Sequence, residues 1–322
     1  MKAAVYDHPG GPEVFRYQEV PDPQLTADGV LIAVEAISVE GGDTLHRAGG
    51  EVLSVPHIVG YQAAGTVLQA GDQVRGFRPG DRVVTVGTEG SHAELRVVPE
   101  RFAWHIPAGL ATEVAACVPI AFGTADDALF EFGRLQPGET VLVQAGASGV
   151  GIAAIQLAKR AGAQVLATAS TDEKLARLAE FGLDHGINYT QAAFHEAVRH
   201  LTGGRGADVF LDTVGGQTLR ASLRCLAYRG RCVSIGDAGR HRGMSIDVST
   251  LRPNNQSLTG YFLGAELFFG NRAHHVIAGR LDDIAAGSLR VVIDRIFPLA
   301  DASAAHAYIE SRQAFGRVLL KP

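Results

Sequence analysis

A glycine-rich run near the middle of the chain has the residue types that a phosphate-binding turn needs. Gly146-Ala147-Ser148-Gly149-Val150-Gly151 has the spacing G-x-x-G-x-G, which differs by one position from the dinucleotide-binding pattern G-x-G-x-x-G. An apolar segment at 140–144 precedes the run directly, and an apolar helical segment at 150–160 follows it. This strand–turn–helix context makes the glycines more specific than their spacing alone.

The chemistry that this run favours is the binding of a diphosphate. Glycine has no Cβ, so the backbone can approach a phosphate closely, and the first N–H groups of a helix carry partial positive charge. We therefore expect the segment from Ala145 to Gly151 to contact a diphosphate. The alternative is a turn that needs glycine only for packing. A serine-hydrolase elbow is not expected, because G-x-S-x-G requires glycine where this chain has Val150.

The residues after the next apolar run bear on which dinucleotide fits. An NAD site usually has an acidic residue at the end of the second strand, where its carboxylate accepts a hydrogen bond from the ribose 2′-hydroxyl. The run at 166–171 has no carboxylate. Asp172 and Glu173 come next, and Lys174 follows them. A lysine there suits the additional phosphate of NADPH, which the sequence therefore favours over NADH. The alternative is a capping box, starting at Ser170, that simply begins a helix.

The elements that position these residues follow an α/β pattern from Thr140 onward. Short apolar runs alternate with longer helical stretches, and each run is continuous, as expected for strands buried on both faces of a parallel sheet. The alternation predicts a Rossmann-type, doubly wound parallel sheet. Apolar runs lie at 141–143, 165–167, 209–211 and 233–235, a further strand at 257–262, and helices near 149–161, 172–181, 191–201 and 215–226.

The first 120 residues have a different pattern, with short Val-rich runs between Gly and Pro turn signals. Runs at 30–37, 65–69 and 81–86 predict a β-rich, barrel-like domain. A helix near 273–286 and a strand at 318–320 complete the chain. For 322 residues, two domains are the natural expectation at roughly 150 residues per domain.

Composition argues against several classes of protein. The chain has 29 basic and 34 acidic residues, and a net charge of −5 argues against nucleic acid as the main partner. No apolar stretch reaches the ~18 residues of a membrane span, and the amino-terminal residues lack the apolar core of a secretory signal. Cys117, Cys225 and Cys232 form no C-x-x-C pair, so we expect buried thiols and a cytoplasmic protein.

Further segments, spread along nearly the whole chain, fit one family pattern by their order and spacing. They are Met1-Lys2-Ala3-Ala4, Gly10-Gly11-Pro12-Glu13-Val14, Asp43-Thr44-Leu45-His46-Arg47-Ala48-Gly49, Phe77-Arg78-Pro79-Gly80-Asp81-Arg82-Val83, Gly90-Ser91-His92-Ala93-Glu94, Asp208-Val209-Phe210-Leu211-Asp212-Thr213-Val214-Gly215-Gly216 and Gly316-Arg317-Val318-Leu319-Leu320. With the glycine-rich run, they resemble the medium-chain dehydrogenase/reductase superfamily, and within it the zinc-independent quinone oxidoreductases of the ζ-crystallin-like branch.

The resemblance implies a fold and an assembly. It implies a GroES-like substrate domain formed by residues 1–122 and 264–322, and a Rossmann NADPH-binding domain at 123–263. It also implies a cofactor cleft between the two domains, and commonly a homodimer joined through the last Rossmann strands. The expected partner is a small quinone or enone, with no nucleic acid and no membrane.

By matching position, the resemblance also implies cofactor contacts. Ser170, Lys174 and Tyr189 correspond to a 2′-phosphate site, Ala145–Gly151 to the diphosphate site, and Thr124 to a place near the nicotinamide. Weaker correspondences are Val214, Gly236 and Arg317. Each residue has a structural alternative. Thr124 and Ser170 are also suited to cap helices, Tyr189 to pack at a strand end, Lys174 to lie in solvent, Val214 and Gly236 to pack in turns, and Arg317 to pair with a surface acid.

Zinc is not expected from these residues. Zinc-bearing relatives have Cys where this chain has Glu40, and a His-Glu pair where it has Tyr61-Gln62. The four-cysteine lobe of a structural zinc is also lacking. His274 and His275 are adjacent, so on a helix they point about 100° apart and do not clamp one ion.

Without a metal, the expected chemistry is hydride transfer from NADPH to a quinone or an α,β-unsaturated carbonyl. Glu40 stands where most zinc-free relatives have Asn. In a dry cleft its pKa should rise and it could donate a proton, or it pairs with a nearby arginine. His46 and Tyr61 are further candidate donors. Asp43 and Arg47, at i,i+4, suggest a helical ion pair.

Two other functions stay open at this point. One is a metal-free alcohol or carbonyl dehydrogenase, which needs a proton relay in place of zinc. The other is an NADPH-binding protein that serves sensing, RNA contact or a structural purpose with little catalysis.

Overall fold

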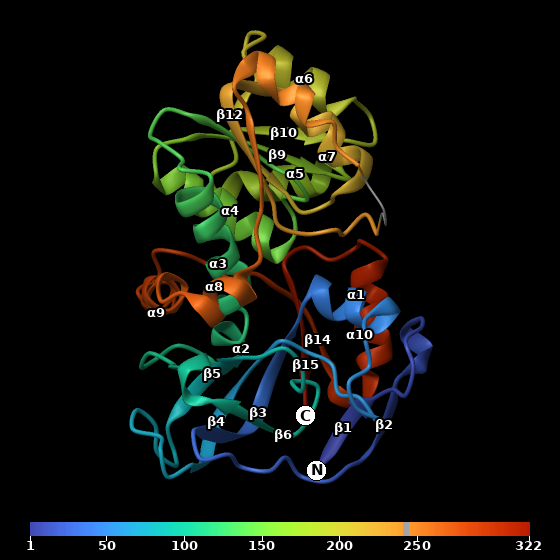
Figure 1. Cartoon of the computed structure of the whole chain (residues 1–322), viewed down its shortest axis with the longest axis vertical. Coiled ribbons are helices and arrows are strands. Elements are labelled where there is room, and N and C mark those ends of the chain that lie inside the picture. Colours follow the sequence, from blue (N-terminus) through green and yellow to red (C-terminus); the bar gives the residue numbers. More distant parts are fainter. Residues whose placement is uncertain (241–244) are drawn as a thin grey trace. The chain divides into compact units, whose positions relative to one another are not determined.

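The chain folds into two units, each with its own main sheet, and the computed structural model describes residues 1–240 and 245–322 (Figure 1). The central unit consists of Ala121–Ala265. The split unit combines Met1–Ile120 with Glu266–Pro322, so both ends of the sequence belong to it.

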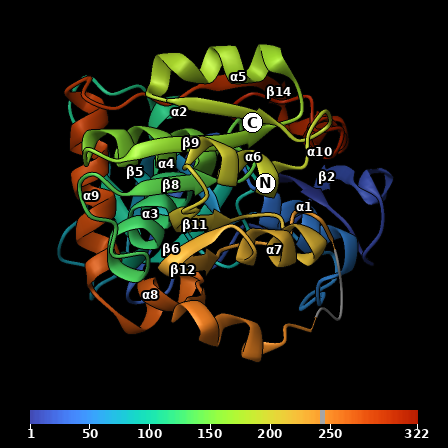
Figure 2. The same ribbon diagram turned by 90° about the horizontal axis from the view of Figure 1, so that it is seen from above.

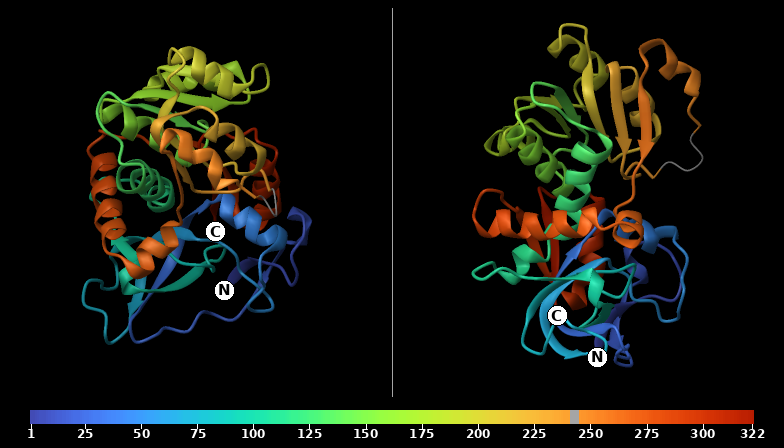
Figure 3. Two further views of the ribbon diagram at one scale, coloured as in Figure 1. Left: turned by 45° about the horizontal axis from the view of Figure 1, so that its top comes forward. Right: turned by 60° about the vertical axis from the view of Figure 1, so that its left-hand side comes forward.

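Among the described residues, six parallel strands form the sheet of the central unit. Their order is β10 (His185–Asn188), β9 (Gln164–Ala169), β8 (Thr140–Val143), β11 (Ala207–Asp212), β12 (Leu226–Ser234) and β13 (Ser257–Gly260). The order reverses between β8 and β11, and open α/β sheets bind their ligands at such a switch point. The predicted doubly wound parallel sheet is confirmed, and Figure 3 shows β11 and β12 side by side.

Helices connect these strands in the predicted order, as α4 (Gly149–Arg160), α5 (Asp172–Leu178), α6 (Phe194–Leu201) and α7 (Gly216–Leu223). α4 packs beside β8 and β9, and α5 beside β9 and β10 (Figure 2). Val198 of α6 and Leu219 of α7 join one apolar cluster with Leu142 and Phe210 of the sheet. α6 begins later than the expected position near 191, because Asn188 first organises the residues after β10 into a turn.

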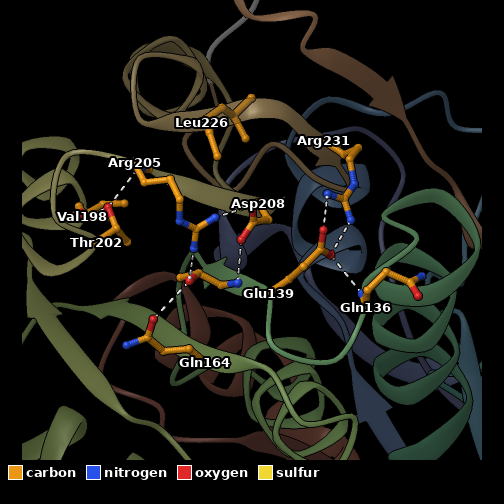
Figure 4. Close-up of polar contacts among 12 residues, drawn as sticks. Gln136, Glu139, Gln164, Val198, Thr202, Arg205, Asp208, Leu226 and Arg231 are labelled. Atoms are coloured by element: carbon orange, nitrogen blue, oxygen red, sulfur yellow. Dashed lines mark hydrogen bonds and ion pairs between the residues drawn. The ribbon is translucent and has the colours of Figure 1, made fainter.

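Charged side chains bind the amino-terminal ends of these strands to one another (Figure 4). Arg231 of β12 donates to both carboxylate oxygens of Glu139, at 2.9 and 2.6 Å. Asp208 of β11 pairs with Arg205 at 2.6 Å and accepts from the Thr140 N–H at 2.8 Å. The network therefore fixes the sheet edge opposite the carboxyl ends of the strands, where the glycine-rich turn lies.

Among the described residues, seven strands form the main sheet of the split unit. Apolar side chains of these strands form the core of the unit. β3 (Gly29–Val39) pairs with β4 (Gln62–Ala70), β6 (Leu95–Pro99) and β15 (Arg317–Lys321). β5 (Arg82–Val86) and β7 (Ala103–His105) extend it on one side and β14 (Ile293–Pro298) on the other, while β1 (Lys2–Val5) and β2 (Arg16–Glu19) pair separately. The β-rich expectation for the first 120 residues is confirmed.

Among the described residues, the α-helices that lie wholly or partly in this unit, besides α3, are α1 (Gly41–Gly49), α2 (Thr112–Ala115), α8 (Leu263–Phe269), α9 (Arg272–Ala285) and α10 (Ala302–Glu310). α3 (Val118–Asp126) begins at the end of its first segment and continues into the central unit. No helix of the described chain is both long and apolar enough to cross a membrane. Cys117, Cys225 and Cys232 are free and buried, as predicted.

Candidate functional site

The glycine-rich run forms the turn between β8 and α4. Ala145 has a φ of +49°, and the helix begins at Gly149. A Cβ on Gly146 would lie 2.8 Å from the Ala167 Cβ, and one on Gly151 would lie 2.5 Å from the Ala145 carbonyl oxygen. The chain itself therefore requires glycine at 146 and 151, so packing accounts for these two positions whether or not a ligand binds.

This turn also leaves backbone donors available. Ser148 is the N-cap of α4, and its hydroxyl accepts from the Gly151 N–H at 3.0 Å. The N–H groups of Ala147, Gly149 and Val150 have no hydrogen-bond partner among the described residues. Three unpaired donors at the start of a twelve-residue helix fit an anionic oxygen group such as a diphosphate.

Thr168 fixes the shape of this turn, and the sequence analysis did not identify it. Its hydroxyl donates to the Gln144 side chain and accepts from the Ala145 N–H at 3.3 Å. Its carbonyl accepts from the Gly146 N–H at 2.8 Å. Because Thr168 lies on β9, it couples the turn after β8 to the neighbouring strand.

Ser170 and Lys174 follow β9, and Tyr189 follows β10, whose last residue Asn188 is paired with Ala169 of β9. Thr171, not Ser170, is the N-cap of α5, so the capping alternative for Ser170 is wrong. The Ser170 hydroxyl has no partner among the described residues. Tyr189 directly follows β10 and is 41% exposed, so packing at the strand end does not account for it. Lys174 is half-buried on α5, not fully in solvent.

Two further turns lie at the carboxyl ends of β11 and β12. Val214 and Gly236 each belong to one of them. The Gly239 N–H donates to the Val214 carbonyl at 2.8 Å, and a Cβ on Gly236 would lie 3.1 Å from the Thr213 carbonyl oxygen. These contacts support the packing alternative for both residues. Thr124 lies inside α3 and is buried, so the alternative that it caps a helix is wrong.

Asp212 holds the first of these turns, and the sequence analysis assigned it no role. Its carboxylate accepts from the Gly215 N–H at 3.0 Å and from the Val214 N–H at 3.4 Å. Burial raises the pKa of Asp212 to about 6, and the nearby Asp237 carboxylate acts in the same direction.

Glu40, the candidate proton donor, lies at the start of α1 in the split unit and is buried. One of its carboxylate oxygens accepts from the Arg317 guanidinium and from the Gln62 side-chain amide. The Ser38 hydroxyl lies 3.5 Å from the same oxygen. Of the two expectations for Glu40, the structure shows the pairing with an arginine.

Arg317 is buried beside β3. It pairs with an acidic residue as the structural alternative expected, but that residue is the buried Glu40, so the expected position of the pair at the surface is wrong. Nε and Nη2 donate to the Ser38 hydroxyl at 3.0 and 2.6 Å, and Nη2 also donates to the Val39 carbonyl at 3.0 Å. Burial lowers the pKa of Arg317 to about 10. Its Nη1 group has no hydrogen-bond partner among the described residues.

Tyr61 is held by its backbone and keeps its hydroxyl unpaired among the described residues. Its N–H donates to the Asp43 carboxylate at 3.2 Å, and its carbonyl accepts from Arg96 at 2.9 Å. Gly42 makes room for the ring, since a Cβ there would lie 2.4 Å from it. Burial raises the pKa of Tyr61 to about 12, so the hydroxyl stays protonated as a donor.

Asp43 and Arg47 do not form the expected helical ion pair. The Asp43 carboxylate accepts from the Glu40 N–H at 2.8 Å and from Tyr61, whereas Arg47 pairs with Glu310 and donates to Gly10. Burial raises the pKa of Asp43 well above its usual range, and the Tyr61 N–H acts against that rise. Asp43 therefore joins Glu40 and Tyr61 at the start of α1.

His46 does not join this group. Its Nε2 lies 2.7 Å from the Glu51 carbonyl oxygen, just past the end of α1, and its ring packs near His57. The structure therefore places two of the three candidate donors together, and the third at the other end of the helix.

The residues at the zinc positions of related enzymes do not fit a zinc ion. The Glu40 carboxylate pairs with the Arg317 guanidinium. Gln62 has only a neutral amide, whose oxygen accepts a hydrogen bond from the Ile120 N–H at 3.1 Å. Within residues 1–240 and 245–322, no three His, Cys, Asp or Glu side chains gather as metal ligands. A second cation beside Arg317 would be repelled.

Known proteins match this chain along nearly its full length. Residues 26–108 match the family model described as alcohol dehydrogenase GroES-like domain, and residues 149–277 match the one described as zinc-binding dehydrogenase. A 2-haloacrylate reductase of a Burkholderia species is 32% identical over 338 aligned positions, which cover 100% of this chain and 99% of the relative. The chain belongs to the medium-chain dehydrogenase/reductase superfamily.

Within the superfamily, the chain falls in the quinone oxidoreductase branch, as the resemblance predicted. Quinone oxidoreductase of Pseudomonas aeruginosa is 32% identical to this chain. The aligned region covers 97% of this chain and 97% of the relative. The crystal structure of Escherichia coli quinone oxidoreductase complexed with NADPH has a TM-score of 0.94 at 28% identity, with both chains covered to 100%.

Proposed function

We propose that the chain is an NADPH-dependent reductase of quinones or other α,β-unsaturated carbonyl compounds, and that it works without zinc. The observation that carries the proposal is the turn between β8 and α4, whose N–H groups at Ala147, Gly149 and Val150 have no hydrogen-bond partner in the part of the chain that the structure describes. The relatives support the same reading, since they include quinone oxidoreductases and a 2-haloacrylate reductase. Quinones and haloacrylates share a carbon–carbon double bond conjugated to a carbonyl group.

The central unit is the part that binds the cofactor in this proposal. The turn at Ala145–Gly151 holds the diphosphate through backbone N–H groups, and Ser170, Lys174 and Tyr189 hold the 2′-phosphate. Support comes from the hydroxyls of Ser170 and Tyr189, which have no partner within residues 1–240 and 245–322. Further support is the lack of a carboxylate between β9 and Thr171. Thr124, Val214 and Gly236 remain proposed contacts of lesser weight. Arg317 is a weaker candidate, because Glu40, Ser38 and Val39 engage two of its nitrogens.

The split unit supplies the groups that act on the substrate. When bound, NADPH supplies the hydride. Negative charge then develops on the carbonyl oxygen of the substrate, and a hydrogen-bond donor aimed at that oxygen lowers the barrier. Tyr61 is suited to this task because its hydroxyl is protonated and has no partner among the residues that the structure describes, while hydrogen bonds hold its backbone N–H and carbonyl.

Glu40 has a positioning role in this mechanism. Its carboxylate accepts from Arg317 and Gln62, so it orients these two donors and does not itself meet the substrate as an acid. Because the Glu40 carboxylate is already paired with the Arg317 guanidinium, it is not available as a metal ligand, which is the basis for proposing a zinc-free reaction. We further propose a cytoplasmic homodimer; light scattering on the purified chain tests the dimer.

The experiment is a panel of NADPH oxidation assays with benzoquinones, enones, enals and unsaturated carboxylates, run with and without a zinc chelator. The proposal expects turnover with at least one of these classes and no loss of rate after chelation. Turnover only with saturated ketones or aldehydes in the same assay, reduction of NADP⁺ by simple alcohols as the sole activity, or a rate that depends on added zinc contradicts it.

A further inference from the structure

One carboxylate follows Ser170 of the proposed 2′-phosphate site, and two side-chain amides hold it in place. Asp172 is the first residue of α5, two positions after Ser170. Asn188 Nδ2 donates to its Oδ1 at 2.8 Å, and Gln191 Nε2 donates to its Oδ2 at 3.2 Å. Both donors come from the end of β10 and the turn after it, so both oxygens of Asp172 are engaged on that side.

The orientation of the Asn188 amide is fixed independently. Its Oδ1 accepts from the Thr190 N–H at 3.1 Å and from the Thr190 hydroxyl at 2.6 Å. An amide has one oxygen and one nitrogen, so an oxygen engaged by Thr190 leaves Nδ2 to face Asp172. Asn188 is also buried, with 9% exposure, which keeps this arrangement in place.

The hydroxyls beside this carboxylate are unengaged. Ser170 and Tyr189 have no side-chain partner among the described residues. The end of β9 therefore offers hydroxyl donors, which suit a phosphate, while its nearest carboxylate is already occupied. The ribose of NADH needs the reverse, namely a carboxylate that accepts from the 2′-hydroxyl.

We infer that Asn188 and Gln191 determine cofactor selectivity, because they hold the Asp172 carboxylate toward β10. An Asp172 carboxylate released from them accepts from the 2′-hydroxyl of NADH and repels the 2′-phosphate of NADPH. The inference rests on the proposed function, since it assumes that this edge of the sheet binds the adenosine ribose. It adds two specificity-determining residues that touch no cofactor themselves.

The test compares the binding of NADPH and NADH, measured by cofactor fluorescence, and of 2′,5′-ADP and 5′-AMP, measured by calorimetry. The release variant is Asn188→Ser with Gln191→Met, which removes both amide donors and adds no charge. Its matched control carries Asp172→Asn in addition, and Asp172→Asn alone is the second control. Melting curves establish that each variant is folded.

We expect the ratio of NADPH affinity to NADH affinity to be lower in the release variant than in the wild type by about 10-fold or more. This is the change in affinity that one charge-assisted hydrogen bond produces. Adding Asp172→Asn restores the ratio to near that of the wild type, and Asp172→Asn alone changes it little. The ratio of the affinities for 2′,5′-ADP and 5′-AMP should change in the same way across the wild type and these variants. If the release variant does not fold, Gln191→Met alone, at an exposed position, should shift the ratio in the same direction.

Two outcomes overturn the inference while leaving the proposed function intact. One is a folded release variant that keeps the wild-type ratio. The other is a lowered ratio that Asp172→Asn fails to restore, which shows that lost packing, not the carboxylate, caused it. Wild-type protein that binds none of the four ligands instead overturns the proposed function, and the inference with it.

Discussion

Arg317 donates to a carboxylate oxygen of Glu40 from 277 residues away in the sequence, and both side chains are buried in the split unit. The contact joins β15 at the end of the chain to the start of α1. Ser38 and Gln62 complete the group. A buried ion pair of this kind contributes to stability only while both partners are present, because each charge alone is costly to bury.

The first prediction concerns this pair. We expect Glu40→Gln and Arg317→Met each to lower the free energy of unfolding by about 3–5 kcal/mol, since each leaves a buried group without its partner. The double variant should lose less than the sum of the two. Trp104 is the only tryptophan and is buried in the split unit, so its fluorescence in urea reports the unfolding of that unit.

An exposed ion pair provides the control for this experiment. Arg16 and Asp7 lie 2.7 Å apart, with side chains 48% and 39% exposed. Arg16→Met should change the free energy of unfolding by about 0–1 kcal/mol. Additive losses in the Glu40 and Arg317 double variant would show that the two side chains are not coupled.

The second prediction concerns Tyr61. If its hydroxyl stabilises charge on the substrate, Tyr61→Phe should lower kcat by about 100-fold and leave the Kd for NADPH unchanged. Stability should change little, because the hydroxyl has no partner in the described protein. With a pKa of about 12, the donor persists from neutral pH to about pH 10, so the difference between the variants should be constant across that range.

Tyr17→Phe is the matched control, because Tyr17 lies in the same unit and is 38% exposed. It should keep wild-type kcat. Equal rates for Tyr61→Phe and Tyr17→Phe would remove Tyr61 from the mechanism.

The third prediction is an acid sensitivity that arises in the split unit. His92 and His306 are fully buried, and their Nε2 atoms lie 3.0 Å apart. Burial, with a smaller effect from Arg96, lowers the pKa of His92 to about 3. Burial also lowers the pKa of His306 well below its usual range, and His92 and Arg47 act in the same direction.

Because these pKa values are lower in the folded state, the unfolded chain takes up protons first as pH falls. The stability contribution of the neutral histidines is complete above about pH 6.5 and is lost on acidification toward pH 3. We expect His92 alone to account for a loss of about 2 kcal/mol at pH 5. Urea unfolding followed at Trp104 between pH 8 and pH 5 measures this loss.

Replacing both histidines by leucine should flatten that dependence, whatever it does to stability at pH 8. His8→Gln, at an exposed position, should leave the slope as in the wild type. A double variant with the full wild-type slope would assign the acid sensitivity to other groups.

The fourth prediction separates the two ends of the strands in the central sheet. Glu139→Gln weakens the contacts to Arg231 at the amino-terminal ends and should lower the free energy of unfolding by about 1.5–3 kcal/mol. It should leave the NADPH Kd unchanged, because the glycine-rich turn lies at the other ends of the strands. Thermal unfolding and a cofactor titration on the same sample test both parts, and an altered Kd would show that the two ends are coupled.

The sequence predicted the central unit well because its signals are local. Continuous apolar runs mark strands buried on both faces, and the glycine-rich run marks the turn and the start of α4 to within one residue. Capping was less predictable. Ser170 and Thr171 are adjacent and both suited to cap a helix, and only the backbone geometry selects Thr171.

The polar groups of the split unit could not be predicted in the same way. Asp43 and Arg47 have the spacing of a helical pair, but Tyr61 and Glu310 offer partners that only the fold brings near. The Glu40–Arg317 contact joins residues on opposite sides of the whole central unit in the sequence. Local periodicity carries no information about such a contact.

The most direct test of the account is a titration of the purified chain with NADPH and with NADH, followed by cofactor fluorescence, alongside Gly151→Ala and Gly260→Ala variants. We predict saturable binding that is tighter for NADPH. Gly151→Ala should weaken it, since the new Cβ would lie 2.5 Å from the Ala145 carbonyl oxygen, whereas Gly260→Ala has open space and should bind normally. No measurable binding of either nucleotide by the wild-type chain would contradict the account.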